Sequence, residues 1–184
     1  KNFNKSIDLS KINIPDLDNI DTHKWSITLF SSGTTGNPKK ISHNFKSITR
    51  FVKYSSKHSK DVWGFAYNPT HIAGVQVFFQ CFLNRNHIVK LFNNAIEDIS
   101  NSIQKYKITH ISATPTFYRL LCFNENFLPT VVKATSGGEH LSKATKSKIS
   151  KIFPNASILN IYASTEAGTV IVSKSDYFQV KNNF

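Results

Sequence analysis

The stretch Ser31 to Lys40 reads SSGTTGNPKK and follows a short apolar run, SITLFS, at residues 26–31. Its two glycines can adopt positive φ, which lets several backbone N–H groups point at one anion. The hydroxyl side chains add donors, and Lys39 adds a positive charge. The stretch is not a Walker A loop, because only Thr34 and Thr35 separate Gly33 from Gly36 and no G-K-[ST] follows. It nevertheless predicts a loop that binds phosphate groups.

Outward from this loop, runs typical of strands alternate with runs typical of helices. Strands are expected at residues 26–31, 62–67, 87–92, 109–114, 131–136, 157–162 and 169–173. Helices are expected at residues 43–58, 73–83, 95–107, 115–121 and 141–153. This alternation predicts an α/β fold in which a mostly parallel sheet carries helices on both faces.

Three polar loops follow predicted strand ends, at residues 31–38, 136–139 and 162–168. In open α/β sheets, ligands bind beyond the carboxyl ends of the strands. We therefore expect the three loops to converge on one ligand site.

The order of residues in several segments is more specific than their composition. SSGTTGNPKK resembles the glycine-rich signature of the adenylate-forming (AMP-binding) enzyme superfamily, with Lys40 in place of a small residue. Further matches follow in the family's order: ISHNF at 41–45, NPTHIAG at 68–74, ISATPTFYRLL at 111–121, SGGEHLS at 136–142 and NIYASTEAG at 160–168. Ala163 stands where the family usually has glycine. Among its members, the chain looks most like acyl- or aryl-CoA ligases, the o-succinylbenzoate type included. The resemblance places it in the central part of the family's large N-terminal domain.

The resemblance implies ATP-dependent activation of a carboxylic acid, with Mg²⁺ as cofactor and CoA as acyl acceptor. The implied phosphate-binding residues are Ser31, Ser32, Gly33, Thr34, Thr35, Gly36, Asn37 and Lys39. The other implied nucleotide-binding residues are Gly137, Gly138, Glu139, Asn160, Tyr162, Ala163, Ser164 and Thr165. The implied catalytic residues are Lys39, Thr165, Glu166 and His71, with Glu166 as the Mg²⁺ ligand.

Each of these residues has a simpler alternative. Glu166 could be an ordinary acid at a helix N-terminus, where the macrodipole favours it. Tyr162 could be a core residue. His71 has two interpretations even within the family, as a wall of the acid pocket or as a hydrogen-bonded core histidine. His43, His110 and His140 do not have the spacing of zinc ligands.

The stretch PTHIAGVQVFFQCF offers no carboxylate that could face the ammonium group of an amino acid. We therefore expect a small fatty or aromatic acid as substrate. A non-catalytic adenine-nucleotide-binding protein is the alternative function.

The net charge of +12 over 184 residues suggests a different class of function, that of a basic nucleic-acid-binding module. The lysines are spread widely rather than clustered, so we expect no nucleic-acid partner. No apolar run has the length of a membrane span. Cys81 and Cys122 lie in apolar stretches and predict buried free thiols, so a cytoplasmic location fits best.

Residues 1–24 are expected to form a polar lead-in, and residues 25–184 part of an AMP-binding domain. The chain contains no Met, no Y-R-T-G-D type motif and no small domain with a catalytic lysine. We therefore expect a segment of a longer enzyme, which alone binds nucleotide weakly and turns over little.

Overall fold

A 7-stranded sheet forms the centre of the protein in the computed structural model, which describes residues 6–13, 21–31, 37–124, 126–166, 168–175 and 178. Its strands lie in the order β1 (Ser6–Asp8), β5 (His87–Lys90), β4 (Val62–Phe65), β6 (His110–Ala113), β7 (Lys133–Gly137), β8 (Ser157–Ser164) and β9 (Gly168–Ser173). From β5 to β8 the neighbouring strands are parallel, and only the edge strands β1 and β9 are antiparallel. The predicted α/β class with a mostly parallel sheet is confirmed.

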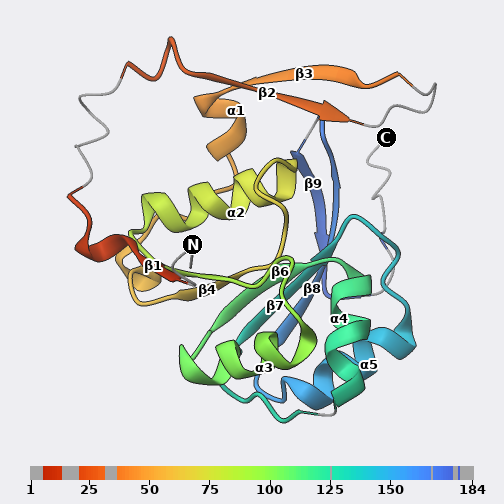
Figure 1. Cartoon of the computed structure of the whole chain (residues 1–184). Coiled ribbons are helices and arrows are strands. Elements are labelled where there is room, and N and C mark those ends of the chain that lie inside the picture. Colours follow the sequence, from red (N-terminus) through yellow and green to blue (C-terminus); the bar gives the residue numbers. More distant parts are fainter. Residues whose placement is uncertain are drawn as a thin grey trace.

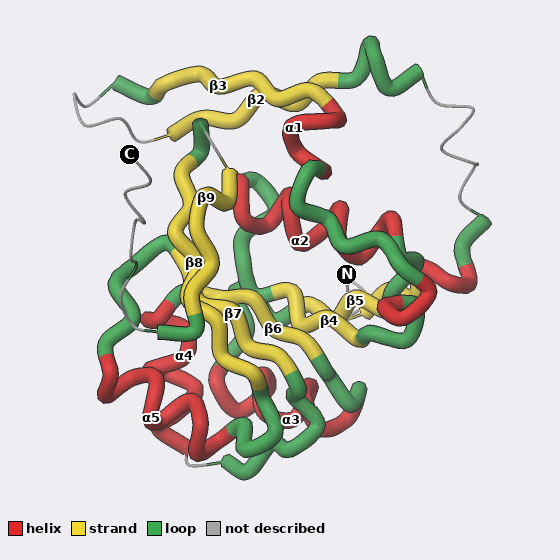
Figure 2. The backbone as a smooth tube through the Cα atoms, turned by 180° about the vertical axis from the view of Figure 1, so that it is seen from behind, coloured by secondary structure: helices red, strands yellow, loops and turns green. Residues whose placement is uncertain are grey.

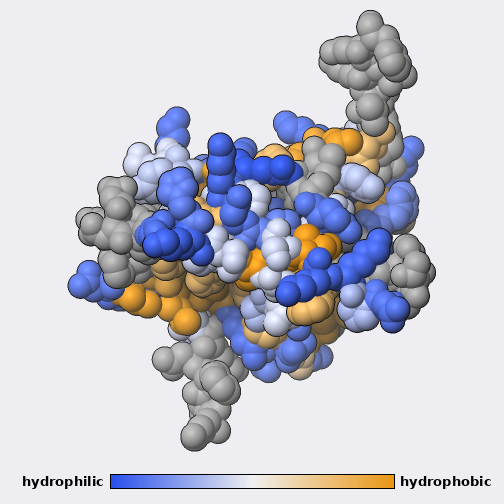
Figure 3. All heavy atoms as spheres, turned by 90° about the horizontal axis from the view of Figure 1, so that it is seen from above, coloured by the Kyte–Doolittle hydropathy of each residue, from blue (hydrophilic) through white to orange (hydrophobic). Residues whose placement is uncertain are grey.

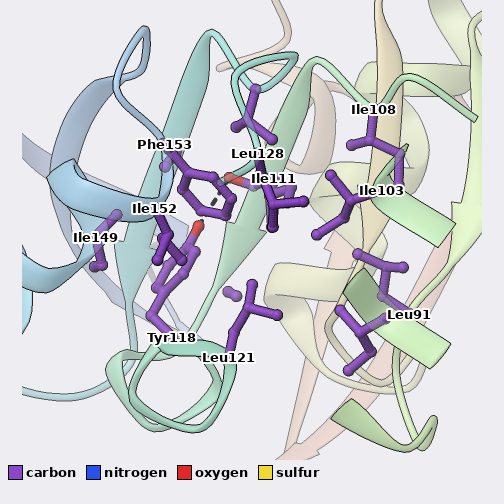
Figure 4. Close-up of a cluster of buried hydrophobic side chains, with 14 of the residues drawn as sticks. Leu91, Ile103, Ile108, Ile111, Tyr118, Leu121, Leu128, Ile149, Ile152 and Phe153 are labelled. Atoms are coloured by element: carbon purple, nitrogen blue, oxygen red, sulfur yellow. Dashed lines mark hydrogen bonds between the residues drawn. The ribbon is translucent and has the colours of Figure 1, made fainter. Parts of the chain in front are cut away.

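Three helices cover one face of the sheet: α3 (Ile96–Lys105), α4 (Pro115–Leu121) and α5 (Lys143–Ile152). Local sequence explains where two of them start. Thr114 caps α4 and is followed by Pro115, which has no N–H group to satisfy, while Ser142 caps α5. The main core lies between these helices and the sheet, and Figure 4 shows Tyr118 and Phe153 at its centre.

The opposite face of the sheet carries α2 (Ile72–Leu83), which packs on Trp63, Phe65 and Tyr67 of the β4 segment. A separate antiparallel pair, β2 (Ser26–Ser31) with β3 (Lys39–Asn44), packs on the outer side of α2 together with the short helix α1 (Phe45–Thr49). Figures 1 and 2 show β8 and β9 extending beyond the other strands toward this hairpin. Figure 3 looks down on that side and shows hydrophilic residues over much of it, with smaller hydrophobic areas between them.

The helix predicted at residues 43–58 is wrong for most of its length. Residues up to Asn44 pair with β2, and only Phe45–Thr49 is α-helical. Beyond it, the backbone of Lys53 donates to Gln80 Oε1 at 2.9 Å, and its carbonyl accepts from Gln80 and Asn84. These bonds to α2 replace the bonds that a continued helix would make.

Three smaller expectations also need correction. Ser6–Asp8, within the stretch expected as a lead-in, pairs with β5. Tyr162–Ser164, expected in a loop, belongs to β8 and pairs with β9 across a bulge. Cys81 is buried as predicted, but Cys122 is only partly buried. Within the described ranges, no helix is long and apolar enough to cross a membrane.

Candidate functional site

A cavity of about 390 Å³ lies between the sheet and α2. The alternation of side chains along the strands determines which residues form the floor of the cavity, because every second side chain points to the same face. In β7 the cavity-lining residues are Lys133, Thr135 and Gly137, while Ala134 belongs to the core on the opposite face. Residues of α2 and of the segment after α1 form the roof. The cavity therefore runs along the parallel strands from their amino ends to their carboxyl ends.

The near end of the cavity, at the carboxyl ends of β7 and β8, brings two of the predicted nucleotide-binding segments together. Gly137 and Gly138 line it from one side, and Ala163, Ser164 and Thr165 from the other. Gly138 has φ +85°, a conformation that glycine adopts without strain. The Tyr67 hydroxyl donates to the carbonyl of Gly137 at 3.1 Å and fixes this turn from within the cavity.

The turn after β8 is fastened to the hairpin. His43 Nε2 lies 2.8 Å from the carbonyl oxygen of Thr165, an acceptor that requires the ring nitrogen to carry the proton. His43 is buried, and its hydrogen bond joins positions 122 residues apart. The segment ISHNF alone predicts no function for His43, since nothing local reveals the partner of its ring.

Lys39 and Glu166 lie near each other at this turn. The pKa of Glu166 is lowered by hydrogen bonds from its own backbone N–H and from the Ser164 hydroxyl, and further by the charge of Lys39. Both side chains are exposed. The start of β3 therefore brings a cation beside the carboxylate at the end of β8.

The described part of the glycine-rich segment consists of its two ends. Residues 32–36, which include Ser32, Gly33, Thr34, Thr35 and Gly36, lie outside the described residues. Ser31 and Lys39 pair across β2 and β3, and Asn37 is exposed. The segment thus joins the strands of an antiparallel hairpin, which corrects the expectation that it follows a strand of the mostly parallel sheet. The His43–Thr165 hydrogen bond still brings the hairpin close to the other two loops, which follow β7 and β8.

Three predicted residues lie away from the cavity or have other partners. Asn160 is buried and does not line the cavity. Tyr162 is 55% exposed and meets Phe178 edge-on, so it is not a core residue. The Glu139 carboxylate accepts from the backbone and side chain of Thr116 at the first turn of α4, at 3.2 and 2.5 Å.

His71 is exposed and lines the cavity, so the interpretation as a core histidine is wrong. It caps α2, because its Nδ1 accepts from the Ala73 N–H at 3.2 Å. The ring stacks near Tyr67, with centroids 6.0 Å apart. His71 is exposed as a whole residue, but loss of water around its ring lowers the pKa of His71, which favours the neutral ring with its proton on Nε2.

The far end of the cavity, at the amino ends of the strands, carries ionisable side chains that the sequence analysis did not connect. Asp61 Oδ2 lies 3.0 Å from His58 Nδ1 and 3.5 Å from His110 Nε2. The Thr109 hydroxyl lies 2.9 Å from His110 Nδ1. A neutral His110 with its proton on Nε2 would direct that proton toward Asp61, while the single proton of the Thr109 hydroxyl lies between His110 Nδ1 and the Val62 carbonyl, 3.1 Å away. Lys53 and Lys133 line the same end.

We expect the stability of the protein to fall as the pH drops from about 6.5 toward 4 through His110. Burial lowers the pKa of His110 to about 4, against the opposing charge of Asp61 and with support from Lys133 and His58. Between the unfolded and folded pKa values the unfolded chain binds the extra proton, so acid favours unfolding. One such group contributes at most about 1.4 kcal/mol per pH unit. Urea unfolding of the wild type and of His110→Gln, which keeps an N–H donor, measures the difference; equal pH slopes would contradict this origin.

A sequence model of the AMP-binding enzyme family matches residues 4–183. The chain therefore belongs to the AMP-binding enzyme family. It is 27% identical over 168 residues to the probable CoA ligase CCL5 of Humulus lupulus, covering 85% of this chain and 30% of that protein. It is 25% identical over 160 residues to the 2-succinylbenzoate–CoA ligase of Bacillus subtilis, covering 83% of this chain and 32% of that protein. The chain thus spans about a third of the length of these two ligases.

The fold agrees with the same family. The o-succinylbenzoate coenzyme A synthetase of Bacillus subtilis, solved in complex with AMP, superposes with a TM-score of 0.66 at 21% sequence identity. The superposition covers 79% of this chain and 31% of that one. The resemblance inferred from the motifs is confirmed at the level of family and fold.

Proposed function

We propose that the protein takes part in ATP-dependent activation of a carboxylic acid. In the first step a carboxylate oxygen bonds to the α-phosphorus of ATP, and the bond to pyrophosphate breaks. In the second step the thiol of CoA attacks the acyl carbonyl, and AMP leaves. The observation that carries the proposal is the cavity in a chain of the AMP-binding enzyme family, whose near end is formed by two segments that resemble nucleotide-binding motifs of that family.

The geometry supports a division of roles at the near end. Lys39 would bind the phosphates together with Asn37 and the segment from Ser31 through residues 32–36. Thr165 would hydrogen-bond the α-phosphate, and its backbone is held by His43. The exposed ring of Tyr162 would lie against adenine, with Gly137, Gly138 and Glu139 on the other side and Ala163, Ser164 and Asn160 supporting the strand end. His71, at the start of α2, would form the wall beside the reacting carboxylate.

Glu166 fits a Mg²⁺ ion, since its carboxylate is exposed, is held ionised and stands beside a cation that can share a phosphate. When bound, Mg²⁺ would neutralise charge on the triphosphate. Lys39 and the hydroxyl of Thr165 would do the same from the protein side.

The middle of the cavity favours a fatty or aromatic acid. Its roof is largely apolar, with Ile48, Val52, Ile72 and Val77 facing Trp63 and Ile161. CoA as the acceptor is supported by the two ligases named above, and the free thiols of Cys81 and Cys122 support a reducing, cytoplasmic setting.

We expect Glu166→Ala to weaken Mg-ATP binding at least about tenfold, because it removes the carboxylate proposed to hold the metal. Calorimetric titration of Mg-ATP into the wild type and the variant measures the effect. Glu97→Ala is the matched control, because Glu97 is an exposed glutamate in α3 on the opposite face of the sheet. Mg-ATP binding that Glu166→Ala leaves unchanged would contradict the proposed site.

Two further measurements separate the other functions. Acid-dependent exchange of pyrophosphate into ATP supports activation, and ATP binding that no acid alters supports a non-catalytic nucleotide-binding protein. DNA binding that ATP does not change and that falls steeply with salt would support the basic module instead.

A further inference from the structure

The far end of the cavity contains a lysine whose ammonium group makes no hydrogen bond or salt bridge to another described residue. Lys133 begins β7, is partly buried and lines the cavity. Within the parts of the chain that the structure describes, no side-chain hydrogen bond or salt bridge involves Lys133. A partly buried cation without a partner is costly, and an anion from outside would remove that cost.

The neighbouring charges leave the far end positive. Lys53 lies close enough to Lys133 for the two charges to interact, and burial together with Lys53 lowers the pKa of Lys133 against the opposing charge of Asp61. Asp61 is the acidic residue among the cavity-lining side chains of the described chain. Its Oδ2 is occupied by His58 and His110 rather than by Lys133. Two lysines thus face one carboxylate that is already hydrogen-bonded.

The length of the cavity floor, from Lys133 to Gly137, suits a ligand with a charged group at each end. The floor of β7 runs from Lys133 to Gly137, five residues, and the four steps between them correspond to about 13 Å at the rise of a parallel strand. The near end is where the reacting carboxylate would lie beside Thr165 and His71. The roof over the middle of the cavity is largely apolar, with the hydroxyls of Ser112 and Thr135 among the lining below it, so a mainly hydrocarbon or aromatic segment would fit there.

We propose that the far end is a subsite for a second anionic group of the acid, bound by Lys133 with support from Lys53. The substrate is then an acid with two anionic groups separated by an apolar segment. This inference deepens the proposed function and rests on it for the identity of the reacting end. The far end itself can be tested without nucleotide.

The test compares azelate, a dicarboxylate, with nonanoate, which has the same chain length and one carboxylate. Calorimetric titration of each acid, without ATP, gives the ratio of their affinities for the wild type, Lys133→Met and Lys148→Met. Lys133→Met keeps the apolar stem and removes the charge. Lys148→Met removes an exposed lysine of α5 on the opposite face and reports non-specific binding to this basic protein.

We expect the wild type and Lys148→Met to bind azelate about tenfold more tightly than nonanoate, and Lys133→Met to bind the two equally. Lys133→Arg, which keeps the charge, should retain the preference. An equal ratio in wild type and Lys133→Met, or no preference in the wild type, overturns the inference. The wild-type ratio decides alone if a variant fails to fold. Loss of the Mg-ATP response with the azelate preference intact would refute the proposed function and not the anion subsite.

Discussion

Tyr118→Ala is expected to lower the free energy of unfolding by about 4 kcal/mol. Tyr118 is fully buried at the centre of the main core, where its ring meets Phe153 edge-on with centroids 6.3 Å apart (Figure 4). Its removal leaves a cavity between α4, α5 and the sheet that the neighbouring rigid elements cannot close. Urea unfolding followed by circular dichroism measures the loss.

Tyr118→Phe is the matched control, because it keeps the ring and removes only the hydroxyl. That hydroxyl lies 3.1 Å from the carbonyl of Ile111 and 3.0 Å from that of Thr135, and the two carbonyls share its single proton. We expect this variant to lose about 1 kcal/mol, the usual contribution of one buried hydrogen bond. If the two variants lost the same amount, the packing of the ring would not be the main contribution.

Gly74→Ala is expected to lower the free energy of unfolding by about 3 kcal/mol, at the upper end of the cost of overpacking. A Cβ at this position would lie 2.2 Å from the backbone oxygen of Asn68, so backbone would have to move. The Asn68 carbonyl already accepts from the His71 N–H at 3.0 Å, and the Asn68 side chain accepts from Thr70. The turn before α2 therefore packs against the first turn of the helix with room for glycine alone.

Gly138→Ala makes the same chemical change for comparison. A Cβ there would meet nothing closer than Thr114 Cγ2 at 3.9 Å, and the cost comes from φ +85°. We expect about 1 kcal/mol for this strain. The order of the two variants, measured by denaturant unfolding, tests the close approach at Gly74. Equal losses would show that the turn yields to a methyl group.

Local sequence signals predicted much of the fold. The proline and threonine before the first turn of α4, and Ser142 before α5, determined where those helices begin. The signals failed where distant groups compete for the backbone. The hydrophobic stripe of residues 43–58 suggests one helix, yet the Lys53 N–H donates to Gln80 and the Lys53 carbonyl accepts from Gln80 and Asn84, which holds Lys53 in another path.

In the candidate site, too, some residues were predicted from the sequence and others depend on partners distant in the chain. The order of motifs predicted that Gly137 and Thr165 would meet, and both line the near end of the cavity. His43, Tyr67 and the Asp61 cluster were not predicted as site residues. Their partners are distant in sequence or lie on a neighbouring strand, so only the register of the sheet brings them together.

Under the proposed function, the parallel register of the floor also limits how acid preference can change among relatives. Inserting one residue into β7 would turn every later side chain to the opposite face and break its pairing with β6 and β8. The pairing of β7 with β6 and β8 therefore fixes the length of the cavity floor. Substitution of roof residues such as Ala73 and Gln76, which make no strand pairs, can shorten or widen the cavity without that cost. Divergence in substrate length is thus expected to accumulate in α2 and the segment after α1, while the strands beneath them keep their length.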